Sequence, residues 1–450
     1  MKKVLVYSHD AYGLGNIRRM LEITSHLVSS DGDVSVLLIS GSPMLHAFRI
    51  PERVDYIKLP CVARSEKGEA IVKTLGLSYE DTIRMRTDMI TMAVMNFAPD
   101  LILVDKKPFG IGNELEPALA MMRKSAHKPK CVLLLRDILD EPGTTTAQWE
   151  QGRYHQAIRD CYDQVLVVGT EEVFDVSSEY RFPTATKEKV RYCGYIRRPA
   201  PRRTAAEVRR DIGVGDEPLV LVTAGGGGDG YDMMLSYLTA LKSRPGRRHK
   251  TLLISGPEMA PAQRAEIFGL AEQAGDVVCR EFSDDMISCM NAADVVVSMG
   301  GYNTVCELLT LQKRTIIVPR VAPVQEQWIR AERMQKLGLL RAVHPDALGS
   351  DALLDAVEEE LVRSNVRSLA MQSFAMDGLP RIAVALREAM AGSPARTAAP
   401  PARSAVRAAM QAAVQAFAGV RRPASAGRAR FFHPLGRRDA RLPNGMVTAP

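Results

Sequence analysis

Cysteine is scarce in this chain, and its spacing fits neither a metal site nor a set of disulfides. Seven cysteines are scattered along 450 residues, with no Cys-x-x-Cys pair among them. Structural zinc sites and disulfide frameworks need clustered or paired cysteines, so the sequence indicates neither. Scattered free thiols are typical of a reducing compartment, and we expect a cytoplasmic protein.

Long apolar runs are missing as well. The N-terminus, MKKVLVYSHD, has an apolar run of four residues, and no segment reaches the roughly 18 apolar residues of a membrane span. We therefore expect neither a signal peptide nor a spanning helix. The expected location is the cytoplasm, and peripheral attachment to the inner face of the membrane is a second expectation.

Two phosphate-site motifs are also absent. No Gly-Lys-Ser/Thr follows the glycine run at 225–228, so this run is not a Walker A loop. The Asp-x-Asp triplet at 31–33 precedes a predicted strand instead of ending one. We expect no metal site beside a bound diphosphate and no resident cofactor.

Positive charge is concentrated in one segment. The chain has a net charge of +7, but ten arginines and one aspartate after Pro394 contribute +9, which leaves −2 for the rest. This distribution does not predict a specific nucleic-acid surface. The Ala-, Pro- and Arg-rich stretch 393–450 is expected to be disordered, either as a solvated appendage or as a weak contact for anionic lipid.

Short apolar strands alternate with helical segments, which predicts an α/β fold. The pattern runs to about residue 196, pauses in a Pro- and Arg-rich stretch and restarts near residue 218. We expect two Rossmann-like parallel sheets facing across a cleft. The expected divisions are an N-terminal domain (1–196), a linker (197–216), a C-terminal domain (217–392) and the tail (393–450).

The polar and glycine-rich segments that follow the predicted strands are the candidate site. Gly225–Gly228 follow the strand PLVLVTA, and amides without a neighbouring Cβ can approach a diphosphate, although such a run is also common in flexible turns. The strand ADVVVS runs into Gly300-Gly301 and a helix with Thr304 and Glu307. That Thr and Glu alone predict a capping box, and beside the glycines they also suit a ribose.

Three further places carry candidate chemistry. Glu326-Gln327 follow the last clear strand and could bind vicinal sugar hydroxyls, or could simply begin a helix. His9 and Asp10 follow the first strand and are candidates for a general base, with a structural role as the alternative. Arg198 stands at the domain junction, where it could pair with a phosphate.

Taken together, these elements resemble the MurG-type glycosyltransferases of family 28, which have the GT-B fold and include glycolipid transferases. The resemblance covers about residues 3–390 and is specific over 281–327, EFSDDM through Glu326-Gln327. It implies a UDP-sugar donor in the C-terminal domain, an acceptor in the N-terminal domain, and inverting transfer of a hexose or N-acetylhexosamine without a metal. The acceptor is unidentified, and a lipid-linked one is among the expectations.

The resemblance also implies roles for individual residues. Glu307 would hold the ribose, and the backbone near Phe282 and Ser283 would read the base. Glu326 and Gln327 would face the donor sugar. The residues implied along the diphosphate are Arg198, Gly226, Gly227, Gly300, Gly301 and Thr304.

One position departs from the family pattern. The N-terminal loop of the family usually ends in Gly-x-Gly-His, and here Asn16 stands in place of the histidine. Asparagine cannot accept a proton at neutral pH, so His9 or Asp10 is the expected base, with Asp105 as a third candidate. A UDP-sugar 2-epimerase and a non-catalytic sugar-nucleotide-binding protein remain as alternatives.

Overall fold

The computed structural model of the chain describes residues 1–391, apart from 10–13, 65–69, 73–74, 126–127, 247, 350 and 364–368. The tail predicted to be disordered, 393–450, lies outside the described residues, and so does Asp10. Within the described part, no helix is long and apolar enough to cross a membrane.

The first sheet has seven strands, all parallel, in the order β3-β2-β1-β6-β7-β8-β9. Its central strands are buried along most of their length, which explains why they read as nearly continuous apolar runs. The strands are β1 (Lys2–Ser8), β2 (Val34–Ser40), β3 (Val54–Lys58), β6 (Leu101–Asp105), β7 (Lys130–Arg136), β8 (Gln164–Val168) and β9 (Val190–Tyr192).

The connections of the first sheet are mainly helical. They are α1 (Leu14–Ser30), α2 (Tyr79–Phe97), α3 (Glu116–Lys124), α4 (Pro142–Gln151), α5 (Tyr154–Cys161), α6 (Val176–Glu179) and α7 (Thr184–Lys187), with the short turns η1 (Leu45–Ala47) and η2 (Ile111–Asn113). An antiparallel pair, β4 (Val62–Arg64) and β5 (Ala70–Val72), stands apart from the sheet. The methionine-rich helix α2 begins at an N-cap, Ser78, whose hydroxyl accepts the amide of Asp81.

The second sheet has six parallel strands in the order β12-β11-β10-β13-β14-β15. These strands are β10 (Leu219–Thr223), β11 (Lys250–Ile254), β12 (Val277–Arg280), β13 (Val295–Ser298), β14 (Arg314–Ile317) and β15 (Arg341–Ala342). Each face of the sheet packs on its own apolar cluster.

The helices that follow the junction complete this second half. They are α8 (Ala205–Asp211), α9 (Tyr231–Ser243), α10 (Pro261–Ala274), α11 (Met286–Ala292), α12 (Tyr302–Leu311), α13 (Glu326–Lys336), α14 (Ala352–Val362), α15 (Leu369–Ser373) and α16 (Gly378–Ala391), with the turn η3 (Pro345–Ala347). The capping box of this half is at α8, where Thr204 and Glu207 cap each other's backbone amides.

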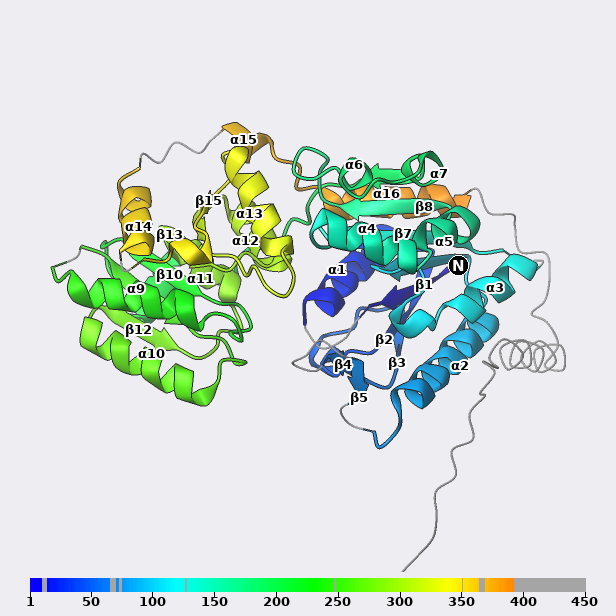
Figure 1. The fold of residues 1–450 in the computed structure, drawn as a ribbon, viewed down its shortest axis with the longest axis horizontal. Helices are drawn as coiled ribbons and strands as arrows, with labels where there is room; N and C mark the ends of the chain where they lie inside the picture. The colour runs from blue at the N-terminus through cyan, green and yellow to red at the C-terminus, as the bar shows by residue number, and fades with distance from the viewer. Residues whose placement is uncertain are drawn as a thin grey trace, which may run out of the picture. The chain divides into compact units, whose positions relative to one another are not determined.

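The last helix returns to the first sheet. Ile382, Leu386 and Met390 of α16 belong to the apolar core that contains β1, β6 and β7, and Figure 1 shows α16 among the elements of that sheet. An isolated bridge between Ile196 and Asp377 marks the point of return. The last helix of the expected C-terminal domain, 217–392, therefore packs its apolar face on the first sheet.

Candidate nucleotide-sugar site

A cavity of about 400 Å³ lies where the carboxyl ends of strands from both sheets converge. In parallel sheets these ends share one edge, where ligands usually bind. From the second sheet the cavity is lined by Ala224–Asp229, Glu258, Ser298–Thr304, Arg320, Glu326 and Gln327, and from the first by Gly15, Asn16, Arg19 and Arg136. A larger groove of about 1120 Å³ runs beside α1, and Arg198 is the one predicted site residue that lines it.

The glycine run after β10 is a packed turn. Gly227 has φ +101°, and a Cβ there would lie 2.4 Å from the carbonyl oxygen of Ser255, so the fold requires glycine. The carbonyl oxygen of Gly226 accepts the amide of Glu258 at 2.7 Å, which holds the turn in place. Gly225, by contrast, has open space where a Cβ would be. This turn can bring backbone amides close to a phosphate.

The glycine turn after β13 ends in an uncapped helix. Gly300 has φ +74°, and a Cβ there would lie 2.6 Å from Cγ2 of Ile317. The N-cap of α12 is Gly301, which has no side chain to accept the first amides of the helix. Such free amides at a helix N-terminus form an anion site.

The predicted capping box of Thr304 and Glu307 is wrong. Because α12 begins at Tyr302, Thr304 is the third helical residue and Glu307 lies in the second turn. Glu307 is 3 % exposed and does not line the cavity. Its carboxylate lies 2.9 Å from the guanidinium of Arg18 on α1. Burial raises the pKa of Glu307, while the charges of Arg18 and Arg198 oppose that rise.

Arg198 is buried between the two halves and already has partners. Its guanidinium donates to Oδ1 of Asn303 at 2.5 Å and to the carboxylate of Glu22. Its backbone amide donates to Thr310 Oγ1 at 3.0 Å. Asn303 in turn donates to the carbonyl oxygen of Gly15 at 3.2 Å, so Arg198 braces the start of α12 against α1.

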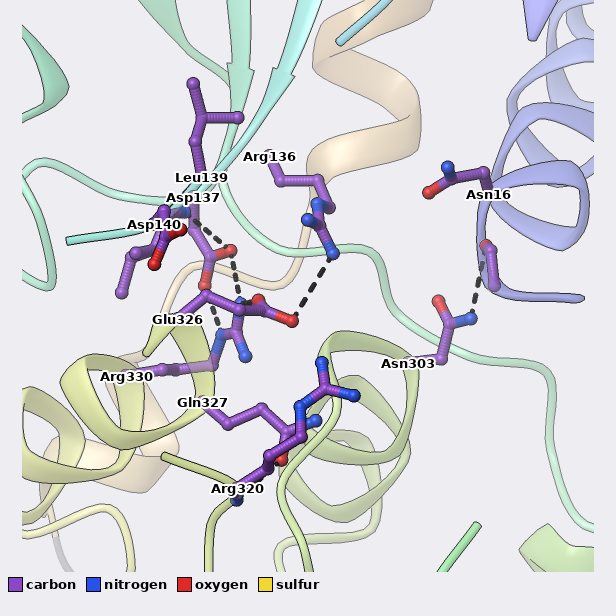
Figure 2. Close-up of polar contacts among 12 residues, drawn as sticks. Asn16, Arg136, Asp137, Leu139, Asp140, Asn303, Arg320, Glu326, Gln327 and Arg330 are labelled. Carbon is purple, nitrogen blue, oxygen red and sulfur yellow. Dashed lines mark hydrogen bonds and ion pairs between the residues drawn. The ribbon is translucent and has the colours of Figure 1, made fainter. Parts of the chain in front are cut away.

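Glu326 and Gln327 begin α13 and line the cavity (Figure 2). The carboxylate of Glu326 accepts a hydrogen bond from Arg330 at 2.6 Å and lies 3.6 Å from Arg136. Burial raises the pKa of Glu326, but the two guanidiniums outweigh this effect and lower it to about 2. Oε1 of Gln327 accepts the amide of Arg320 at 3.0 Å. Glu326 is thus a fixed, ionised acceptor at the cavity wall.

Phe282 and Ser283 lie outside the cavity, in the segment after β12. Phe282 is 61 % exposed, and the hydroxyl of Ser283 accepts the amide of Asp285 at 3.3 Å. An exposed aromatic ring beside a fixed backbone turn provides a stacking surface for a planar base.

On the first sheet, His9 and Asp105 lie together at the ends of β1 and β6. The amide of His9 donates to Asp105 at 3.3 Å, and Arg19 donates to the same carboxylate at 2.6 Å. Asn16 donates its side-chain amide to the carbonyl oxygen of His9 at 2.7 Å. Asp105 is consequently held as a buried, charge-paired acceptor, while Asn16 fixes the backbone of His9.

Sequence reasoning missed several charged residues of the site. Arg136 ends β7 and Arg320 follows β14, so the rule that selected Glu326, a polar residue at the carboxyl end of a strand, would have found both. Lys106 directly follows β6 with φ +71°. Burial, assisted by the charge of Arg136, lowers the pKa of Lys106 to about 7. No sequence signal predicts that shift.

No cluster of His, Cys, Asp or Glu suited to a metal ion occurs within the described part of the chain. The positive charges at the cavity are those of the arginines and of the helix N-termini.

Comparison with known families identifies the second half. Residues 220–382 match the glycosyltransferase family 28 C-terminal domain. An uncharacterized glycosyltransferase of Methanopyrus kandleri is 28% identical over 171 residues, which are 37% of this chain and 44% of that protein. The UDP-N-acetylglucosamine--N-acetylmuramyl-(pentapeptide) pyrophosphoryl-undecaprenol N-acetylglucosamine transferase of Mannheimia succiniciproducens is 30% identical over 115 residues, 25% of this chain and 32% of the relative. The chain thus spans less than half the length of these curated relatives.

Solved structures agree on the fold across both halves. The MurG of Acinetobacter baumannii superposes with a TM-score of 0.55 at 16% identity, covering 86% of this chain and 100% of that one. A UDP-GlcNAc 2-epimerase from Neisseria meningitidis gives 0.55 at 14% identity, covering 87% and 100%. At these identities the likeness shows the fold alone, and the predicted two-sheet GT-B architecture is confirmed.

Proposed function

We propose that this chain, whose residues 220–382 form a glycosyltransferase family 28 C-terminal domain, transfers a hexose or N-acetylhexosamine from a UDP-sugar to an acceptor hydroxyl. The observation that carries the proposal is the cavity wall. It combines a rigid glycine turn, an uncapped helix N-terminus and an ionised buried carboxylate, Glu326. These are the groups needed for a diphosphate on one side and a sugar on the other.

In this proposal the diphosphate lies against the glycine turn at Gly226 and Gly227 and against the start of α12. Helix N-termini favour negative charge, and Arg136 and Arg320 add cations at the same cavity. The carboxylate of Glu326 accepts hydrogen bonds from the sugar hydroxyls, and the side-chain amide of Gln327 donates to them. The ribose would go to Glu307, which requires Arg18 to leave that carboxylate. Phe282 and Ser283 would face the base.

The reaction follows as a displacement at the anomeric carbon. The acceptor oxygen forms the new bond to that carbon while the bond to the diphosphate oxygen breaks, and the electron pair leaves with UDP. A group on the first sheet takes the acceptor proton. His9 and Asp10 remain the proposed bases, and Lys106 is a further candidate because its pKa of about 7 lets it exist as a free amine near neutral pH.

A UDP-sugar 2-epimerase is the second candidate. Asn16 occupies the position of the family histidine and is tied to the backbone of His9, so no imidazole is supplied from that position. Three carboxylates line the cavity, those of Asp229, Glu258 and Glu326, and acid–base groups around the sugar are what epimerisation needs.

Calorimetry with UDP and UDP-N-acetylglucosamine tests the proposal directly. The wild type should bind both nucleotides, Glu307→Ala should lose UDP affinity, and the exposed-site control Glu332→Ala should not. Unchanged UDP binding by Glu307→Ala would remove Glu307 from the donor site. Incubation of the wild type with UDP-N-acetylglucosamine alone, followed by NMR, separates the two enzymes, because an epimer formed without an acceptor identifies an epimerase.

A further inference from the structure

Arg330 contacts two residues of the cavity wall, Glu326 and Gly300, and a third residue, Asp137, that does not line the cavity. It lies one turn after Glu326 on α13, and its side chain is fully buried. Its Nη2 donates to Glu326 Oε2 at 2.6 Å, and its Nη1 donates to the carbonyl oxygen of Gly300 at 3.2 Å. Its Nε and Nη2 donate to the two carboxylate oxygens of Asp137 at 2.6 and 2.9 Å. Figure 2 shows this guanidinium between Asp137 and Glu326.

Aromatic residues enclose this group. The hydroxyl of Tyr195 donates to Asp137 at 2.8 Å, and the ring of Tyr195 stacks on Tyr302 with centroids 5.8 Å apart. The guanidinium carbon of Arg330 lies 5.7 Å from the centroid of Tyr302. Because the surroundings are closely packed and each guanidinium nitrogen has an acceptor, Arg330 has one orientation available.

Stability alone does not explain such a cluster. Two cations, Arg136 and Arg330, face two carboxylates, Asp137 and Glu326, so the set is neutral. Buried ion pairs lose much of their attraction to desolvation, and apolar residues of similar volume often stabilise a protein equally well. Two members of the set, Arg136 and Glu326, line the cavity, which points to a requirement of the site.

We propose that Arg330 is a positioning residue that keeps the carboxylate of Glu326 aimed at the donor sugar, and that Asp137 makes this arrangement depend on the first sheet. The inference rests on the proposed function, in which Glu326 touches the sugar and Arg330 acts through Glu326. Sugar recognition in the second half is then coupled to the acceptor half through one buried ion pair.

The charge of Glu326 provides a measurable signature. Besides Arg136 and Arg330 of this set, Arg320 after β14 lowers the pKa of Glu326, and Lys106 after β6, whose own pKa is about 7, also interacts with this carboxylate. Removal of Arg330 leaves burial less opposed, so the pKa of Glu326 rises. The carboxylate then takes up a proton at higher pH and loses its capacity as an acceptor-only group.

The experiment compares the affinities for UDP and for UDP-N-acetylglucosamine across pH, by calorimetry, in wild type, Arg330→Met, Arg330→Lys and Asp137→Asn. Arg333→Met is the matched control, because Arg333 is on the same helix, partly exposed and paired with Glu179. We expect Arg330→Met to bind UDP about as well as wild type does. Its affinity for UDP-N-acetylglucosamine, relative to its affinity for UDP, should be about tenfold lower than in wild type. That loss should deepen from about pH 7 to pH 5, and Arg330→Lys should restore part of it.

The possible results separate a failure of the proposed function from a failure of this inference. A wild type that binds neither nucleotide overturns the proposed function and this inference with it. A wild type that binds both, with Arg330→Met matching Arg333→Met at every pH, overturns the inference alone. Should Arg330→Met fail to fold, Asp137→Asn takes its place: a selective loss for the sugar nucleotide supports the coupling, whereas equal losses for both nucleotides indicate a merely structural role and overturn it.

Discussion

The guanidinium of Arg18 on α1 lies 2.9 Å from the buried carboxylate of Glu307 on α12, the group proposed to hold the donor ribose. The pair joins the two halves of the chain. Because Arg18 is 43% exposed, the pair is a modest one, comparable to the surface ion pairs that contribute up to about 1 kcal/mol. In the proposed function, the ribose and Arg18 would therefore compete for one acceptor.

Replacement of Arg18 should favour the nucleotide. We expect Arg18→Met to bind UDP about two- to fivefold more tightly, because Glu307 no longer has to leave a partner. The same change removes a charge that opposes the raised pKa of Glu307, so UDP binding should weaken at a higher pH than in wild type. Titration calorimetry from neutral to acidic pH measures both effects, with Arg84→Met as a remote control. Weaker UDP binding by Arg18→Met at neutral pH would mean that Arg18 itself contacts the ligand.

Loss of Asp137 should lower the free energy of unfolding strongly. Asp137→Ala leaves the guanidinium of Arg330 buried with one carboxylate fewer, and breaking a buried pair typically lowers the free energy of unfolding by about 3–5 kcal/mol. Urea unfolding measures this quantity. Glu179→Ala, which breaks the partly exposed pair with Arg333, should lower it by no more than about 1 kcal/mol. Equal effects for the two variants would contradict the burial argument.

The uncapped start of α12 offers a test that separates stability from binding. Gly301 has φ −57° and ψ 147°, which serine adopts readily, and open space surrounds its missing Cβ. Gly301→Ser should cap the helix and raise the free energy of unfolding by a few tenths of a kcal/mol. The new hydroxyl would occupy the amides proposed for phosphate, so UDP affinity should fall. Thermal unfolding measures the expected gain in stability, and calorimetry on the same sample measures the expected loss of UDP affinity. An increase in UDP affinity would argue against a phosphate at α12.

Lys106 should destabilise the folded chain in a pH-dependent way. Its pKa of about 7 in the folded chain lies below the ordinary value near 10.4 for an unfolded lysine. The unfolded state therefore binds more protons between these values, so the penalty is complete below about pH 7 and fades toward about pH 10. Lys106→Met should raise the free energy of unfolding at pH 6.5 and have little effect near pH 10, as urea unfolding can show. The exposed Lys124→Met serves as control, and a pH-independent gain in Lys106→Met would refute the shift.

Local pattern predicted the elements well where burial is complete. The apolar runs PLVLVTA and ADVVVS contain the strands β10 and β13, which are buried at every position, because a buried strand of a parallel sheet reads as a nearly continuous apolar run. The edge strand β3, Val54–Lys58, was missed because three of its five residues are exposed and its pattern is neither continuous nor alternating. The two-residue strand β15 gives no pattern at all.

Sequence also predicted some features of the candidate site and missed others. Glycine runs and the Glu326-Gln327 pair were found because their positions at strand ends can be read along the chain. The burial of Glu307 against Arg18 and the ionised state of Glu326 were not, because each depends on charges supplied by the other half of the chain. The lowered pKa of Lys106 was not found either, because it depends mainly on burial, which the neighbouring residues in the sequence do not specify.

The sequence by itself determined the two parallel sheets and the segments that surround the cavity, since strand burial and glycine turns are encoded over a few consecutive residues. Tertiary structure alone decided that α16 packs on the first sheet, that Glu307 pairs with Arg18, and that Arg330 joins Glu326 to Asp137, which lies 193 residues from Arg330 along the chain. The physical reason is that these contacts are electrostatic and packing interactions between distant segments, whose energies depend on burial and on partners that no local pattern specifies.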